Sequence, residues 1–284
     1  LLIGVDEEGG TVVRVSSNPN LRETPFLSPK DTYADGGWDA VKQDAEEKAD
    51  LLLSLGINVN LAPVCDMTSD EYGFIYDRSF SSDVDMENRY VRTVVETSKS
   101  KKLGTVLKHF PGYGNNSDTH TGIAYDDRDY SEFENTDFKP FYQGIESGAD
   151  CILVSHNIVN CMDSEYPASL SQKVHDILRN EFKFDGVIMT DDLIMDAITD
   201  FTGDEAAAVT AAKCGNDLLC CSSVDTQYPA VLEAVQNGEI PEAQVDASVK
   251  RILKWKQNLG IFSIDTYQKK VKSTEPTDTV ESEE

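Results

Sequence analysis

Apolar strands alternate with amphipathic helices along most of this 284-residue chain, and this alternation constrains the fold more than any other feature. Short apolar runs predict strands at residues 1–6, 57–62, 105–110, 151–156, 186–192 and 217–221. Each of these strands is followed by a segment whose apolar residues keep helical spacing. Because such alternation is typical of parallel βαβ units, the sequence predicts an α/β fold with a parallel sheet.

Most of the predicted strands also end in a polar or ionisable residue. These residues are Asp6, Asp66, Lys108, His109, His156, Asp191 and Asp192. In a (β/α)8 barrel the C-terminal ends of the strands converge on one face, where the active site lies. The alternative is an open doubly wound sheet, which usually carries a Gly-rich phosphate loop, and Glu8-Gly9-Gly10 matches such a loop only weakly. We therefore predict a TIM-type (β/α)8 barrel.

Only six strands are clear in the sequence, and a missing first strand–helix unit would fit the abrupt start at Leu1. The helices are expected at residues 39–55, 86–101, 138–148, 170–182, 205–213, 228–237 and 242–259. We expect residues 1–262 to form one barrel domain and residues 263–284 to form an acidic, mobile tail.

Composition excludes several classes of partner. Acidic residues outnumber basic ones 51 to 25, and the formal net charge is −26. Nucleic acid and anionic membranes are therefore not expected to bind, because both need clustered Lys and Arg. The chain has no run of about 18 apolar residues, so no membrane-spanning segment is expected.

The six cysteines show neither a CxxC pair nor metal-ligand spacing with histidine. Free, buried thiols are favoured over a disulfide framework in a chain of this size. The chain starts without Met and inside a strand pattern, so we expect that something upstream was removed or left out. The cellular compartment, whether cytoplasm or cell envelope, stays open.

One stretch of thirteen residues, 108–120, concentrates ionisable side chains beside a Pro-Gly turn. It holds Lys108, His109, Asp118 and His120. A carboxylate at Asp118 can fix the tautomer of His120 and raise its basicity, as in a catalytic dyad. Asp191, at the end of an apolar strand, is a candidate nucleophile that needs a partner to protonate a leaving oxygen.

A metal site built from His109, His120, Asp6 and Asp191 is the competing interpretation of the same residues. No ligand pair among them stands at helical spacing, so neither a metal nor another cofactor is expected.

The segment from Lys108 to Gly114, followed by Asp118-Thr119-His120, resembles the β-N-acetylglucosaminidase branch of family 3 glycoside hydrolases. The resemblance runs almost the whole length of the chain. Its further matching segments are residues 5–10, 60–66, 77–80, 190–195 and 251–262. Several motifs in the right order are a far more specific signal than any one of them alone.

The resemblance implies a role for each catalytic group. Asp191 would be the nucleophile that forms a glycosyl-enzyme intermediate, and His120 would be the general acid/base, held and tuned by Asp118. An imidazole suits this task near neutral pH, since its unshifted pKa is about 6.5.

The resemblance also implies sugar-binding residues. Lys108, His109, Arg78 and Asp6 would hydrogen-bond the sugar hydroxyls, and Arg78 could also meet an anionic substituent.

Three departures from the family pattern stand out. Tyr113 occupies a position where the family commonly has a second histidine, and Thr11 occupies one where arginine is usual. The loop from Gly114 to Asp118 is one residue shorter than expected. None of these changes removes a proposed catalytic group, but the short loop bears on how His120 reaches the substrate.

The sequence thus predicts a retaining exo-β-N-acetylglucosaminidase that acts on peptidoglycan fragments or chitin-like oligosaccharides. A β-glucosidase or β-xylosidase, a phosphorolytic enzyme of the same family and a catalytically weakened sugar-binding relative remain alternatives.

Overall fold

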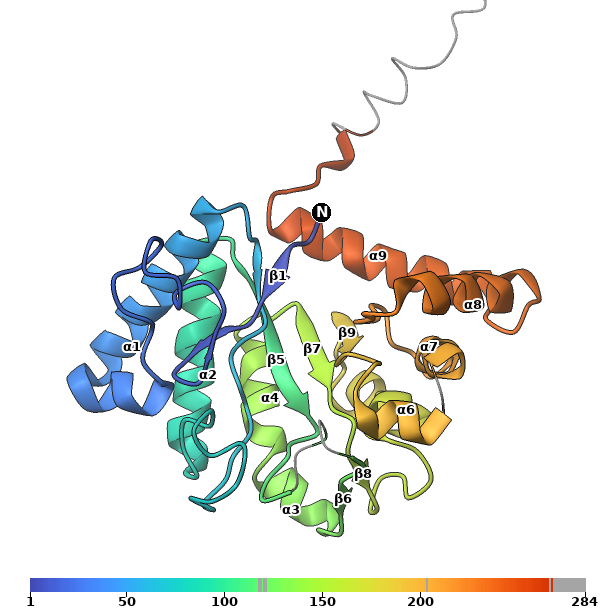
Figure 1. Cartoon of the computed structure of the whole chain (residues 1–284), viewed down its shortest axis with the longest axis horizontal. Helices are drawn as coiled ribbons and strands as arrows, with labels where there is room; N and C mark the ends of the chain where they lie inside the picture. The colour runs from blue at the N-terminus through green and yellow to red at the C-terminus, as the bar shows by residue number, and fades with distance from the viewer. Residues whose placement is uncertain (117–118, 120–121, 203, 266, 268–284) are drawn as a thin grey trace, which may run out of the picture.

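A parallel sheet lies at the centre of the computed structural model, which describes residues 1–116, 119, 122–202, 204–265 and 267 (Figure 1). Its strands, in spatial order, are β1 (Gly4–Val5), β4 (Val59–Asn60), β5 (Gly104–Phe110), β7 (Cys151–Val154) and β9 (Val187–Thr190). All four neighbouring pairs are parallel. The prediction of an α/β fold with a parallel sheet is confirmed.

The strand order decides between the two predicted sheet types. In a doubly wound sheet the order reverses at a switch point, whereas the five described strands follow the order of the chain. Beyond β9, Leu218 forms a parallel bridge with Met189, so the next segment continues the sheet. The described sheet is therefore a parallel half-barrel, and the doubly wound alternative is wrong. Closure into an eight-stranded barrel stays a prediction.

Helices follow the strands as the alternation predicts. They are α1 (Pro29–Ser54), α2 (Val84–Ser100), α3 (Tyr130–Asn135), α4 (Phe138–Glu146), α5 (Gln172–Asp176), α6 (Asp196–Thr202), α7 (Asp204–Lys213), α8 (Val224–Gln236) and α9 (Glu242–Asn258). Two small sheets complete the fold. One pairs β2 (Glu7–Gly9) with β3 (Val12–Val13), and the other pairs β6 (Tyr125–Asp126) with β8 (Ile158–Val159). Within the described residues, no helix has the length and apolar content needed to cross a bilayer.

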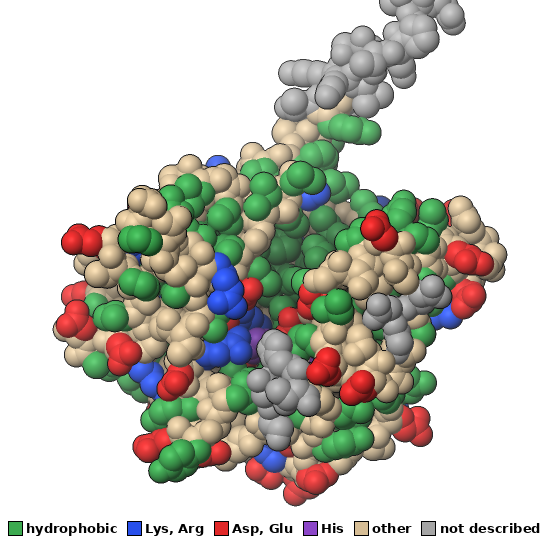
Figure 2. Space-filling view, in the orientation of Figure 1, with side chains coloured by type: hydrophobic (Ala, Val, Ile, Leu, Met, Phe, Trp, Pro, Cys, Tyr) green, Lys and Arg blue, Asp and Glu red, His purple; other side chains and the backbone are tan. Residues whose placement is uncertain are grey.

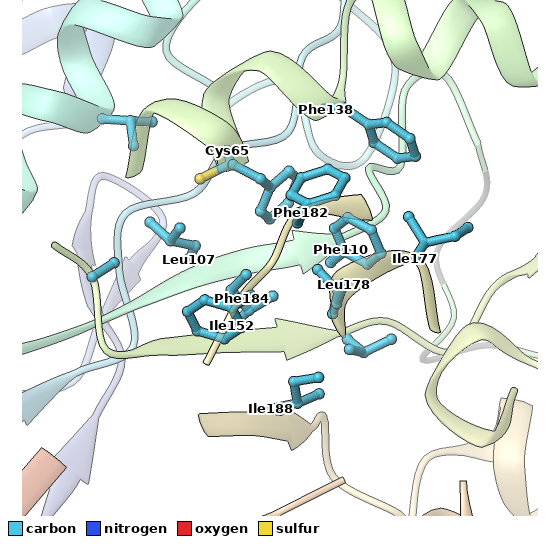
Figure 3. Close-up of a cluster of buried hydrophobic side chains, with 14 of the residues drawn as sticks. Cys65, Leu107, Phe110, Phe138, Ile152, Ile177, Leu178, Phe182, Phe184 and Ile188 are labelled. Atoms are coloured by element: carbon cyan, nitrogen blue, oxygen red, sulfur yellow. The ribbon is translucent and has the colours of Figure 1, made fainter. Parts of the chain in front are cut away.

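The two faces of the sheet pack against different cores, because successive side chains of a strand point to opposite sides. On one face, a cluster rich in phenylalanine joins the strands to α2 and α4, and Figure 3 shows part of it. On the other face, Val106, Leu153 and Met189 pack with Trp255 of α9. Trp255 lies against the start of β5, where a Cβ on Gly104 would come within 3.1 Å of its ring. Helix α9 thus covers the sheet near the amino ends of its strands, whereas the polar strand ends lie at the carboxyl side.

Some element boundaries differ from those expected. Helix α1 begins at Pro29 rather than residue 39, because Ser28 caps it and the helical stretch continues across a non-helical kink at Gly36 and Gly37. The helix expected at residues 170–182 is divided into α5 and a π-helical turn, Ile177–Glu181. The strand expected near residue 217 is reduced to the bridge at Leu218. The predicted tail, residues 263–284, lies almost wholly outside the described residues.

A buried carboxylate ties the last described part of the sheet to two helical segments. Asp217, whose side chain is 1% exposed, accepts hydrogen bonds from Arg179 Nη2 at 2.5 Å and from Arg251 Nη1 at 2.9 Å. It also accepts from Ser248 Oγ at 2.8 Å and from the backbone N–H of Ile188 at 2.9 Å.

We expect Asp217→Ala to lower the free energy of unfolding by about 3 kcal/mol, because two guanidinium groups lose the carboxylate they share. The control is Asp185→Ala, which removes a 77% exposed partner of Lys254 and is expected to cost less than about 1 kcal/mol. Urea unfolding of both variants measures the difference. Equal losses would contradict the structural role given to Asp217.

Candidate active site

The carboxyl ends of the strands bring together polar groups that lie far apart in the sequence. Asp6 follows β1, and Asp66 comes a few residues after β4. Lys108 and His109 lie near the carboxyl end of β5, and Arg78 comes from the loop before α2. Figure 2 shows basic side chains and a histidine gathered in a hollow of this face, with acidic side chains on its other side. The four sugar-binding residues expected from the sequence thus lie in one ion-pair network.

A buried lysine stands at the centre of this network. Lys108 is only 2% exposed, and its Nζ lies 2.6 Å from Asp6 Oδ1 and 2.6 Å from Glu8 Oε1. Burial alone would lower the pKa of Lys108, but the carboxylates of Glu8 and Asp6 outweigh burial and raise it. Asp6 keeps 38% of its side chain exposed, so it stays accessible to a ligand while holding the ammonium.

Glu8, which the sequence did not single out as a site residue, links Lys108 to Arg78. Arg78 donates from Nε to Glu8 Oε2 at 2.9 Å and from Nη2 to Glu8 Oε1 at 2.8 Å. A bidentate pair of this kind fixes the plane of the guanidinium. Burial would raise the pKa of Glu8, yet Lys108 and Arg78 together lower it to about 2. Glu8 is therefore ionised across the neutral range.

Hydrogen bonds assign the ring proton of His109. Arg78 Nη2 lies 3.2 Å from His109 Nε2, and a guanidinium can only donate. When the ring is neutral, its proton therefore lies on Nδ1, which donates to Asp66 Oδ2 at 2.7 Å.

Asp66 is a second residue whose role the sequence did not reveal. Its fully buried carboxylate also accepts the backbone N–H of His109 at 3.1 Å and that of Tyr113 at 2.8 Å. One side chain thus holds both ends of the turn that leaves β5. Asp66 was visible in the sequence as a strand-end acid, but nothing there identified its partners.

Asp191 follows β9 directly, and its surroundings favour the ionised form of its side chain. Its backbone N–H donates to the Val154 carbonyl at 3.3 Å, and its Oδ1 accepts the backbone N–H of Asp192 at 2.9 Å. Burial alone would raise the pKa of Asp191. The neighbouring His156, with His109 and Lys108, outweighs burial and lowers the pKa below its usual range.

His156 and Asp192 support the turn that carries Asp191. The Nε2–H of the buried His156 donates to the Asp192 carbonyl at 3.1 Å, and its Nδ1 lies 2.7 Å from Ser169 Oγ. The Asp192 carboxylate accepts the backbone N–H groups of Ile194 and Ser222 at 3.2 and 3.1 Å. Asp192 therefore caps the turn.

The predicted acid/base pair, Asp118 and His120, lies outside the described residues, although the start of its loop is described. Gly112 has φ +118°, and a Cβ there would come within 2.4 Å of Asp137 Oδ1. Arg128 donates to Asp137 Oδ2 at 2.9 Å and to the Gly112 carbonyl at 3.2 Å. These contacts explain the Pro-Gly turn of the motif, because only glycine fits that conformation and that close approach.

The site contains an ionised carboxylate, Asp191, near donors already neutralised by Asp6 and Glu8. Such an arrangement suits a neutral, hydroxyl-rich ligand whose reacting carbon is attacked by a carboxylate. Within the described ranges, no cluster of three or more His, Cys, Asp or Glu side chains is arranged to hold a metal ion.

Comparison with known proteins identifies the family. Residues 1–255 match the model of the glycosyl hydrolase family 3 N-terminal domain. The chain belongs to glycosyl hydrolase family 3. The resemblance found in the sequence is thereby confirmed, and with it the prediction that the chain is a glycoside hydrolase.

Curated relatives of this chain include two proteins named beta-hexosaminidase. The one from Hydrogenovibrio crunogenus is 32% identical over 252 residues, which cover 86% of this chain and 70% of the relative. The one from Nitrosomonas eutropha is 33% identical over 233 residues, which cover 80% of this chain and 66% of the relative.

Among solved structures, a family 3 β-N-acetylglucosaminidase from a Paenibacillus species superposes with a TM-score of 0.85 at 30% identity. The alignment covers 92% of this chain and 50% of that one. The chain therefore spans about two thirds of the length of the two curated relatives and half of the Paenibacillus protein.

The ion-pair network predicts how stability depends on pH. The pKa of Glu8 falls from 4.5 to about 2 on folding, so ionised Glu8 stabilises the fold above pH 4.5, and this contribution is lost as the pH falls toward 2. Between pH 5 and pH 3, Glu8 should account for about 2 kcal/mol of the lost stability.

Urea unfolding at pH 5 and pH 3 measures this dependence. We expect the stability of Glu8→Gln to fall less than that of the wild type over this interval. Glu146→Gln, at an exposed position of α4, serves as the control and should keep the wild-type dependence. An unchanged pH dependence in Glu8→Gln would contradict the lowered pKa.

Proposed function

We propose that this chain is a retaining exo-β-N-acetylglucosaminidase that removes terminal N-acetylglucosamine from peptidoglycan fragments or chitin-like oligosaccharides. The observation that carries the proposal is Asp191, a carboxylate with a lowered pKa at a strand end beside Lys108 and His109. The β-hexosaminidase names of two relatives support the substrate class. We further propose that the half-barrel belongs to a complete (β/α)8 barrel, as its chain-ordered strands suggest.

In the first proposed step, Asp191 attacks the anomeric carbon of the sugar. A bond forms between the carboxylate oxygen and that carbon while the glycosidic bond breaks, and the leaving oxygen takes a proton from His120. In the second step, His120 removes a proton from water, whose oxygen attacks the same carbon and releases the Asp191 carboxylate. Asp118 would hold His120 and stabilise its protonated form.

We propose that Lys108 and Arg78 bind the substrate through N–H donors that the ion-pair network does not use. An ammonium has three N–H donors, and the structure engages Lys108 with two carboxylates. Arg78 uses Nε and Nη2 within the network. Among the described residues this leaves Nη1 for a hydroxyl or an anionic substituent of the substrate. Asp6, which is partly exposed, would accept a hydrogen bond from a sugar hydroxyl.

The activity is tested with 4-nitrophenyl N-acetyl-β-glucosaminide and N,N′-diacetylchitobiose. We expect Asp191→Ala to lower kcat by more than about 10³-fold on both, because the nucleophile is lost. His120→Ala should lower kcat/KM on diacetylchitobiose by about 10²-fold or more. Asp196→Ala, an exposed acid at the start of α6, is the control and should retain wild-type rates.

The same assays separate the alternatives. If the wild type is no faster than Asp191→Ala and His120→Ala, the chain is a sugar-binding relative and the enzyme proposal fails. Faster cleavage of glucosides or xylosides than of N-acetylglucosaminides would make it a β-glucosidase or β-xylosidase. Formation of N-acetylglucosamine 1-phosphate in phosphate buffer would reveal phosphorolysis.

A further inference from the structure

Tyr113 is one of the departures from the family pattern, and the structure places it firmly beside the strand end. Its side chain is 2% exposed. Its ring makes edge contacts with Phe74 and His109, with centroids 4.9 and 5.2 Å apart. Its backbone N–H donates to Asp66 Oδ1 at 2.8 Å. The ring of Tyr113 is therefore packed against His109, and its backbone is held by Asp66, which also binds the His109 ring.

The hydroxyl of Tyr113 has a specific partner. It lies 2.7 Å from Thr119 Oγ1, and Thr119 is fully buried. Burial and the charge of Asp191 raise the pKa of Tyr113, so the phenol keeps its proton at neutral pH. Two buried hydroxyls that satisfy each other make a definite link, because either one without a partner would be costly.

Thr119 stands in the sequence between Asp118 and His120, the proposed acid/base pair. The start of the same loop has its own attachment, since Thr68 Oγ1 donates to Asn115 Oδ1 at 2.6 Å. Asn116 continues a turn by donating its backbone N–H to the Tyr113 carbonyl at 2.9 Å. The link to Thr119 is thus the described contact nearest in sequence to the acid/base pair.

We propose that Tyr113 is a positioning residue that holds the acid/base loop through the Thr119 hydroxyl. A phenol reaches further from its Cα than an imidazole does, so this link depends on the tyrosine that replaces the histidine common in the family. The inference rests on the proposed function, because it assigns proton transfer to His120.

The test exploits the different needs of two leaving groups. 2,4-Dinitrophenolate departs without protonation, whereas the sugar alkoxide released from N,N′-diacetylchitobiose needs a general acid. The variants are Tyr113→Phe, which keeps the ring packing, and Thr119→Val, which keeps the shape. Thr119→Ser keeps the hydroxyl and is the matched control. Thermal unfolding establishes that each variant is folded.

We expect Tyr113→Phe and Thr119→Val to lower kcat/KM on diacetylchitobiose by about tenfold or more, since part of the general-acid contribution is lost. On 2,4-dinitrophenyl N-acetyl-β-glucosaminide both should stay close to the wild type, and Thr119→Ser should match the wild type on both substrates. The double variant Tyr113→Phe/Thr119→Val should be no slower than either single variant, because both remove the same link.

Three outcomes would overturn the inference. Equal losses on the two substrates would show that the hydroxyl pair supports the whole site, and no loss on either would show that the loop does not need it. In both cases the proposed function stands, because the wild type is active. A wild type without activity on both substrates overturns the proposed function, and the inference fails with it.

Discussion

The buried ammonium of Lys108, shared between Asp6 and Glu8, is the interaction on which the rest of the site depends. Burying a charge without partners is costly. Here the partners come from the segment that follows β1, and the lysine lies near the end of β5. Arg78 extends the network by pairing with the same Glu8. The arrangement therefore ties the turn after β1, the end of β5 and the loop before α2 to one another. Removing one member of the network would leave the charge of its partner buried with less compensation.

Charged groups around Asp191 explain how the proposed nucleophile can stay ionised in a strongly acidic protein. The chain carries a formal net charge of −26, which would favour protonation of a buried acid. At Asp191 the local groups act in the opposite direction, since His156, His109 and Lys108 lower its pKa. These groups lie near Asp191 because parallel strands arranged in chain order bring their carboxyl ends to one edge of the sheet. The fold thus determines the electrostatics of the site.

The sequence predicted the features that depend on local pattern. The apolar run of β5, its ionisable end and the strand-ending Asp191 were visible because neighbouring residues alone define them, and the structure brings Asp6, Arg78, Lys108 and His109 into one network. The family resemblance added the roles, which stay proposals for Asp191, Asp118 and His120. Helix α6 was not foreseen, because its seven residues follow the strand-end turn too closely to show a period of their own.

What the sequence did not reveal depends on long-range partners. Glu8 acquires its role from Arg78, 70 residues away, and Asp66 from His109, 43 residues away. His156 supports the turn that carries Asp191 through the Asp192 backbone carbonyl, which no side-chain pattern records. The role proposed for Tyr113 also could not be inferred from the sequence, because its partner Thr119 is identified only by the contact between the two hydroxyls.

The most direct test of the central claim, that Asp191 is the nucleophile, is covalent trapping with a 2-fluoro or 5-fluoro N-acetylglucosaminyl-type inhibitor. Peptide mass spectrometry of the inactivated protein would locate the sugar. Our account predicts one sugar per chain, attached to the peptide that contains Asp191, and no label in Asp191→Ala. Labelling of a different residue, or equal labelling of the Asp191→Ala variant, would contradict it.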